Sequence, residues 1–244
     1  MTNIISQAVK RLFANGQNQS KGSRMRCESR DDYDQRFQMT LREWLLYHQK
    51  DVIFDDCKWM GVRSLKNPLD AWVYQEIIYE VKPDVIIEIG SYAGGGTLFF
   101  AHMLDLIGNG MVVSVDIDRS HYNVEHPRIT TVTGNSSSEE VVSKVASLCK
   151  DKKVMLLHDG DHNKAQVLLD LKAYSGLVSK GSYILVEDGV VDLFDAGDGM
   201  ALTGDGPLAA VEEFLRTNSD FEIDESKERY ILTYNPKGFL RRVN

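Results

Sequence analysis

The chain has 244 residues, 43% of them hydrophobic and 26% charged, with a formal net charge of −8 at pH 7. This length allows one large domain with terminal additions, and the composition is that of an ordinary globular protein. The acidic charge argues against a nucleic-acid partner, because neutralising phosphates requires a basic face. A basic tail at Lys237, Arg241 and Arg242 could form a local patch, although a solvated terminus explains it better.

Localisation is predicted from what the sequence lacks. No stretch approaches the ~20 apolar residues that span a bilayer, so we expect no membrane partner. Residues 1–14 do not show a basic start followed by an apolar run, so we expect no signal peptide. Cys27, Cys57 and Cys149 are scattered and form neither a disulfide framework nor a zinc spacing. These features predict a cytoplasmic protein.

Residues 1–58 are predicted to be a helical extension that precedes the main domain. Apolar residues recur with helical spacing over residues 4–13, and residues 37–47 show a second helical pattern. The polar segment 15–30 is typical of a loop. The extension could cap the domain, cover a substrate or mediate contacts between copies of the chain, and we expect a homo-oligomer.

Residues 59–244 show strands that alternate with helices. A helix is predicted after Asn67, a good N-cap, with Pro68 at its first position and Pro83 beyond its end. Strands are predicted over residues 84–89, 111–115, 129–132, 154–157 and 182–186. Helices are predicted over residues 97–106, 138–149, 164–178 and 207–215.

The end of the chain is expected to close the sheet with an antiparallel hairpin formed by residues 221–224 and 229–235. Before it, residues 189–206 form a long segment rich in Gly and Asp that is predicted to be a loop. The alternating pattern predicts an α/β, Rossmann-like fold with a mostly parallel central sheet of about seven strands.

Acidic residues stand at nearly every predicted strand end. In an open α/β sheet, ligands bind beyond the carboxyl ends of the strands, where the strand order reverses. Carboxylates brought together there cost energy unless a cation or a hydrogen-bond donor offsets them. The acids in question are Glu88, Asp116, Asp159, Asp161, Glu187 and Asp188.

The segment 88–96 is a glycine-rich turn that predicts a nucleoside cofactor. Its glycines let the backbone approach a ligand, and Asp116 at the next strand end can accept hydrogen bonds from a ribose diol. The turn lacks the dinucleotide pattern G-x-G-x-x-G, and Glu88 would repel a pyrophosphate but suit a cationic sulfonium. We therefore favour S-adenosylmethionine, with a plain tight turn that packs helix on sheet as the alternative.

Three acids, Asp161, Glu187 and Asp188, are predicted to bind a divalent metal. They follow two consecutive strands, and three hard oxygen ligands suit Mg²⁺, Mn²⁺ or Ca²⁺. The alternative is a set of surface acids and helix caps, with Asp161 capping the helix that begins near residue 164. His158 and His162 flank the site, but its oxygen-rich surroundings make neither our choice as ligand.

Lys164 is the predicted base. It follows Asp161 by three residues, so its ammonium can lie above the same pocket and take the proton of an acceptor hydroxyl. A solvated lysine in a first helical turn is an equally good explanation. The candidate catalytic residues are Lys164 as the base, His162 as the alternative base beside the site, and Asp161 as a metal ligand.

The chain resembles the cephalosporin hydroxylase / rhamnosyl O-methyltransferase family over about residues 59–214. The matching segments are Trp59-Met60-Gly61, Lys66-Asn67-Pro68-Leu69-Asp70, Tyr74-Gln75-Glu76-Ile77, Glu88-Ile89-Gly90-Ser91, Asp116-Ile117-Asp118, His126-Pro127-Arg128-Ile129, Gly160-Asp161-His162 and Val186-Glu187-Asp188. The segment Asp161-His162-Asn163-Lys164 is also similar to the metal-aspartate and lysine-base segment of catechol O-methyltransferases. The resemblance implies S-adenosylmethionine and metal sites at these residues, with Ser136 near the adenine. The predicted cofactor-binding residues are Glu88, Gly90, Ser91, Tyr92, Gly95, Asp116, Ser136 and Asp159.

Together these features predict an O-methyltransferase that depends on S-adenosylmethionine and a divalent metal. Its substrate is expected to be a hydroxyl of a small molecule such as a sugar, a glycoside or a natural product. An NAD(P)-dependent oxidoreductase would share the glycine turn and Asp116 but would have no evident use for the acidic triad. A non-catalytic nucleoside-binding module is the other alternative.

Overall fold

The computed structural model of the chain describes residues 29–200 and 204–244. The chain divides into two compact units, residues 1–56 and residues 57–244. Within the described residues, none of the helices is both long enough and apolar enough to cross a membrane.

The first unit contains short helices. They are α2 (Arg30–Phe37), α3 (Leu41–Tyr47), the π-helix η1 (His48–Ile53) and α4 (Phe54–Asp56). Ser29 and Asp32 form a capping box at the start of α2, and Thr40 and Glu43 form another at the start of α3. The predicted helix over residues 37–47 is therefore corrected, because the second capping box starts a new helix at Leu41. The helix predicted over residues 4–13 lies outside the described residues, as does nearly all of the predicted loop 15–30.

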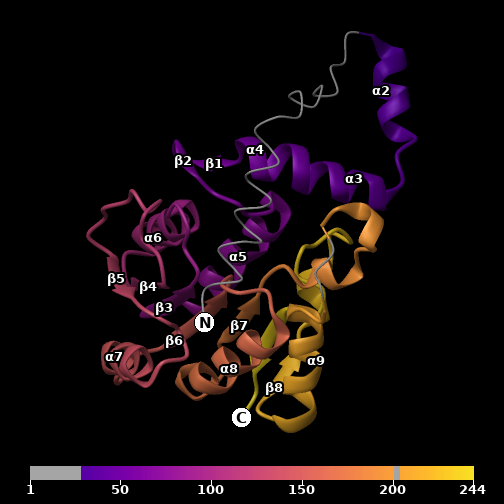
Figure 1. The fold of residues 1–244 in the computed structure, drawn as a ribbon. Helices are drawn as coiled ribbons and strands as arrows, with labels where there is room; N and C mark the ends of the chain where they lie inside the picture. Colours follow the sequence, from indigo (N-terminus) through magenta and orange to yellow (C-terminus); the bar gives the residue numbers. More distant parts are fainter. Residues whose placement is uncertain (1–28, 201–203) are drawn as a thin grey trace. The chain divides into compact units, whose positions relative to one another are not determined.

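The second unit begins with a small hairpin of β1 (Lys58–Trp59) and β2 (Val62–Arg63). Its turn residues Met60 and Gly61 both have positive φ, as two-residue hairpins favour. The main strands are β3 (Val85–Ile89), β4 (Met111–Asp116), β5 (Ile129–Thr133), β6 (Val154–His158), β7 (Tyr183–Val186), β8 (Phe221–Ile223) and β9 (Phe239–Arg242). The helix α5 (Pro68–Val81) precedes these strands, and α6 (Gly95–Ile107), α7 (Glu139–Cys149), α8 (Lys164–Tyr174) and α9 (Pro207–Thr217) lie between them in the sequence (Figure 1).

The seven strands form one sheet in the order β5-β4-β3-β6-β7-β9-β8. The first five are parallel, whereas β9 pairs antiparallel with both β7 and β8. The predicted Rossmann-like α/β fold is confirmed. The strand order reverses between β3 and β6, because the chain runs from β3 outward through β4 and β5 and then returns to the other side of β3.

The closing hairpin differs from the prediction in its second strand. β8 pairs with β9, and residues 229–235 are not a strand. The backbone N–H of Tyr234 and the hydroxyl of Thr233 instead donate to the buried carboxylate of Asp70, at 2.8 and 2.6 Å. A donor engaged by this carboxylate cannot also join a strand ladder. Residues 229–235 therefore act as a connection.

Both faces of the sheet are covered. One hydrophobic cluster joins α5 and α6 to one face, and a second joins α7, α8 and α9 to the other. The central strands β3 and β6 are buried at every residue, which explains their unbroken apolar runs. After β7, the predicted loop 189–206 contains two short 3₁₀ helices, Gly189–Leu193 and Ala196–Asp198, in its described part.

Candidate active site

The carboxyl ends of β3 and β6 approach each other closely at the reversal point. Gly90 has φ +84°, and a Cβ added to it would lie 2.0 Å from the carbonyl oxygen of Asp159. The N–H of Asp159 donates to the carbonyl of Ile89 at 2.8 Å. Only glycine fits at position 90, so the predicted cofactor turn and the acidic segment after β6 are held side by side.

Asp116 clamps this turn from the end of β4. Its Oδ2 accepts hydrogen bonds from the N–H of Ser91 at 2.8 Å, the hydroxyl of Ser91 at 3.0 Å and the N–H of Tyr92 at 3.0 Å. Its Oδ1 accepts from the N–H of Asp118 at 3.0 Å. Three predicted cofactor residues, Ser91, Tyr92 and Asp116, are therefore brought together, and Asp116 also shapes the turn.

The other predicted cofactor residues have different surroundings. Glu88 is buried and accepts from the hydroxyl of Thr97. Its burial raises its pKa to about 7, although Lys66 and Thr97 act to lower it. A Cβ on Gly95 would lie 2.2 Å from the carbonyl of Arg63, so this glycine lets the small hairpin pack against α6. The carbonyl of Ser136 accepts from the hydroxyl of Tyr174 at 2.7 Å.

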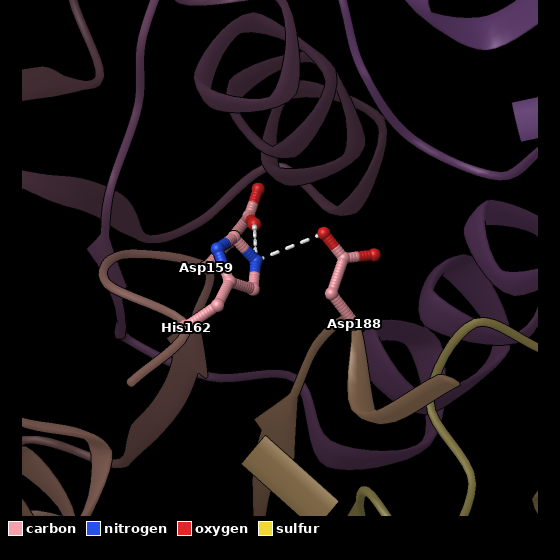
Figure 2. A group of neighbouring side chains, drawn as sticks. All are labelled: Asp159, His162 and Asp188. Carbon is pink, nitrogen blue, oxygen red and sulfur yellow. Dashed lines mark hydrogen bonds and ion pairs between the residues drawn. The ribbon is translucent and has the colours of Figure 1, made fainter. Parts of the chain in front are cut away.

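Asp159, His162 and Asp188 form a cluster at the ends of β6 and β7 (Figure 2). The same nitrogen of His162, Nε2, lies 2.9 Å from Oδ2 of Asp188 and 3.7 Å from Oδ1 of Asp159. Burial acts to lower the pKa of His162, but its hydrogen bond with Asp188 and the two carboxylates raise it to about 9. One ligand atom from each residue lies within 4.8 Å of the others, which is close enough to share a metal ion.

The predicted metal triad shares only Asp188 with this cluster. The backbone of Asp188 has φ 58°, and its N–H donates to Oδ1 of Asn235 at 3.1 Å, which fixes the residue in a left-handed conformation. Asp161 lies three residues beyond the end of β6, and its Oδ1 accepts from the N–H of Asn163 at 2.9 Å. Oδ2 of Asp161 carries no such bond among the described residues. Glu187 is 5% exposed, and its Oε1 is buried without a hydrogen-bond partner in the described part of the chain.

Lys66 is the site residue that sequence reasoning missed. Its Nζ lies 2.5 Å from Oε2 of Glu187 and also pairs with Oδ2 of Asp159. Burial acts to lower the pKa of Lys66, but Asp159, Glu187 and Glu88 outweigh it and raise that pKa. The same lysine lowers the pKa of Asp159 against the effect of burial. Its signals in the sequence were its position directly before the predicted N-cap and its place in the family-like segment Lys66-Asn67-Pro68-Leu69-Asp70.

Lys164 points elsewhere. Its Nζ pairs with Oδ2 of Asp205 at 3.1 Å and with Oε2 of Glu213 at 3.2 Å. Hydrogen bonds with these two carboxylates raise the pKa of Lys164. The structure therefore does not bring Lys164 together with His162 and Asp188, and its role as the base stays a prediction.

The fold and this edge of the sheet are those expected of an enzyme that binds a nucleoside cofactor beside a cluster of acidic residues. The rhamnosyl O-methyltransferase/CmcI family model matches residues 51–243. The chain is 32% identical over 209 residues to a rhamnosyl O-methyltransferase from Mycobacterium leprae, which covers 82% of this chain and 89% of that protein. A Mycobacterium tuberculosis rhamnosyl O-methyltransferase is 28% identical over 82% of this chain and 84% of its own length.

Solved structures agree in fold. The Mg-SAM form of CmcI superposes with a TM-score of 0.63 at 19% identity, covering 100% of this chain and 98% of that one. The chain belongs to the rhamnosyl O-methyltransferase/CmcI family. This assignment confirms the predicted family and the predicted class of enzyme, an S-adenosylmethionine-dependent O-methyltransferase, over the oxidoreductase and the non-catalytic module.

Asp116→Asn is expected to weaken binding of S-adenosylhomocysteine by about 1–3 kcal/mol, the range for a hydrogen bond to a charged group. An amide has a neutral oxygen and two N–H donors, so it cannot accept the same set of turn amides and still serve a ribose diol. Titration calorimetry measures the affinity, with Asp118→Asn, an exposed acid two residues on, as the matched control. Equal affinity in both variants and the wild type would remove Asp116 from the cofactor site.

Proposed function

We propose that the chain transfers the methyl group of S-adenosylmethionine to a sugar hydroxyl of a small glycoside, with the help of one divalent cation. The observation that supports this most is the meeting of acids from β3, β6 and β7 beside the glycine turn. Because β3, β6 and β7 are neighbours in the sheet, their ends bring Glu88, Asp159, Glu187 and Asp188 to one edge. Such a group of carboxylates favours cationic ligands.

The residues fit a Mg²⁺-like ion. Carboxylate oxygens are the ligands that hard divalent cations prefer, and the buried Oε1 of Glu187 has no hydrogen-bond partner among the described residues. We propose that Glu187, Asp188 and Asp161 hold the ion, with Asp159 and His162 adjoining it. When bound, a divalent cation orients an acceptor hydroxyl and makes it more acidic.

The chain's own residues have three tasks in this proposal. Asp116 and the turn that it clamps hold the cofactor, and Ser136 borders the adenine. Glu88 places a carboxyl group near the cofactor's sulfonium, whose positive charge would favour the ionised form of Glu88. The acceptor oxygen then attacks the methyl carbon as the carbon–sulfur bond breaks, which leaves S-adenosylhomocysteine. The hydroxyl proton passes to Lys164, to His162 or to water.

A sugar acceptor is supported by the names of the relatives, which are rhamnosyl O-methyltransferases. The extension over residues 1–58 is proposed to cover the acceptor or to join copies of the chain, as the sequence suggested. A homo-oligomer and a cytoplasmic location remain predictions.

Thermal unfolding tests the proposal. S-adenosylmethionine and S-adenosylhomocysteine should raise the melting temperature, by the equivalent of about 2.7 kcal/mol at a concentration 100 times the dissociation constant. NAD should leave the melting temperature unchanged. A screen of hydroxylated sugars and glycosides with methyl-labelled cofactor then identifies the acceptor. Stabilisation by NAD alone would contradict the proposed cofactor.

A further inference from the structure

Lys66 is a buried cation that touches the acidic ends of two strands. It is 8% exposed, and its Nζ pairs with Glu187 at the end of β7 and with Asp159 at the end of β6. Glu88, at the end of β3, is close enough to affect its charge. A single ammonium group therefore pairs with acids that follow β6 and β7 and lies near Glu88 of β3, at the edge where the cofactor and the cation are proposed to bind.

The lysine is fixed from its own side as well. Asn67, the next residue, caps α5 by accepting the N–H of Leu69 at 3.1 Å and donates its amide to Asp70 at 2.9 Å. Gly96 leaves room for the side chain, because a Cβ there would lie 2.8 Å from Cε of Lys66 and 3.0 Å from Oε1 of Glu88. Both observations indicate a built position for the ammonium group.

The ion pairs leave the two oxygens of Glu187 in different states. Oε2 is 2.5 Å from Nζ of Lys66, whereas Oε1 is buried with no hydrogen-bond partner among the described residues. Tyr74 and Asp159 also interact with Glu187, but neither forms a hydrogen bond with Oε1. An unpaired buried carboxylate oxygen is costly, and a cation at Oε1 would offset that cost. Lys66 also prevents the carboxylate from turning, since rotation would break an ion pair that is shielded from water.

We propose that Lys66 is a positioning residue that locks Asp159 and Glu187 together and leaves Oε1 of Glu187 as the oxygen for the divalent cation. This inference rests on the proposed function, because it assumes that a cation binds at the ends of β6 and β7. It assigns Lys66 no contact with the acceptor and no proton transfer. Groups that orient metal ligands in this way typically contribute about 10–100-fold in metal affinity.

Mn²⁺ binding to the full chain tests this role. The electron paramagnetic resonance signal of the free ion measures how much Mn²⁺ is bound. Lys66→Met should weaken Mn²⁺ binding about 10-fold or more, and by a larger factor than it weakens binding of S-adenosylhomocysteine, measured by calorimetry. Lys66→Arg keeps the positive charge and can donate to both carboxylates, so it should recover part of the Mn²⁺ affinity that Lys66→Met loses. Lys180→Met is the control, since Lys180 is exposed and precedes β7 at the opposite edge of the sheet.

Unchanged or tighter Mn²⁺ binding by Lys66→Met would overturn the inference, because removing a mere counter-charge should favour a cation. If Lys66→Met does not fold, Lys66→Gln retains one donor for Glu187 and should show an intermediate loss; wild-type affinity in that variant overturns the inference equally. Failure of the wild type to bind Mn²⁺ is a separate result. It would contradict the proposal that the chain binds a divalent cation, and with it the proposed role of Lys66. Failure of only the variant comparison leaves the proposed function standing.

Discussion

Removal of divalent cations with EDTA should abolish methyl transfer, and added Mg²⁺ or Mn²⁺ should restore it. The expectation follows from the acids at the ends of β6 and β7, where a cation would supply several kcal/mol of the charge stabilisation that the reaction needs. Initial rates with labelled cofactor measure the effect. Binding of S-adenosylhomocysteine should survive EDTA, since the proposed cofactor turn lies at β3 and β4. Full activity in EDTA would contradict the proposal that methyl transfer needs a divalent cation.

Asp188→Asn is the matching variant, because Asp188 belongs both to the predicted triad and to the observed cluster. We expect a loss in kcat of at least about 10²-fold, equivalent to several kcal/mol. Asparagine tolerates the left-handed backbone of this position, with φ 58°, and its N–H can still donate to Asn235. The fold should therefore be retained, and an unchanged melting temperature checks this.

Two further variants separate the predicted triad from the observed cluster. Asp161→Asn should weaken Mn²⁺ binding if Asp161, Glu187 and Asp188 hold the ion. His162→Gln should weaken it instead if the ligands are Asp159, His162 and Asp188, whose ligand atoms lie within 4.8 Å of one another. Loss in the second variant alone would replace the predicted triad with the observed cluster.

The parallel part of the sheet could be predicted from sequence because its signals are local. Runs of β-branched and aliphatic residues marked β3 and β6, and Asn67 with Pro68 marked the start of α5 as observed. The acids at the strand ends followed from the same periodicity, since the residue after a buried strand lies at the sheet edge. Local patterns therefore predicted the architecture and the gathering of acidic residues at one edge of the sheet.

What the sequence did not reveal depends on contacts between distant residues. Lys66 is separated by 93 positions from Asp159 and by 121 from Glu187, so no spacing rule connects them. The second strand of the closing hairpin was misplaced for a similar reason, because Asp70 engages Thr233 and Tyr234 across more than 160 positions. Buried polar contacts of this kind appear only when the chain is folded.

Lys164 shows a different limit, which concerns side-chain direction. Its spacing from Asp161 placed it near the site, and α8 does begin at Lys164. Its ammonium nevertheless pairs with Asp205 and Glu213, which are 41 or more positions away and which no local pattern connects with Lys164. Spacing locates a backbone position but does not determine which partner a long side chain finds.

The identity of the base is the second large effect to be tested. If Lys164 takes the proton, Lys164→Met should lower kcat by about 10²–10⁴-fold, since methionine keeps the length of the side chain but cannot accept a proton. The loss should shrink at high pH, where hydroxide can ionise the acceptor without the lysine. Cofactor affinity should not change, because the ammonium pairs with Asp205 and Glu213, which lie outside the turn at residues 90–96.

Asp205→Asn distinguishes Lys164 as the base from Lys164 as a purely structural residue. Hydrogen bonds with Asp205 and Glu213 raise the pKa of Lys164, and a base must lose its proton before it can act. Removing one carboxylate should lower that pKa, so the rise of kcat with pH should move to lower pH in Asp205→Asn. The shift should vanish when Lys164→Met is already present, because no lysine remains to titrate.

Wild-type turnover in Lys164→Met would assign the proton to His162 or to water, and His162→Gln then decides between them. Without a cation, Asp188 and Asp159 hold the pKa of His162 at about 9 against the effect of burial, so the imidazole is protonated at neutral pH. His162 can accept a proton only after it has lost the one it carries. That loss requires another positive charge, such as a metal ion, to lie beside Asp188 instead. A His162 base therefore predicts activity that rises with cation concentration and falls about 10²-fold or more in His162→Gln. Full activity in both single variants would leave water as the acceptor of the proton.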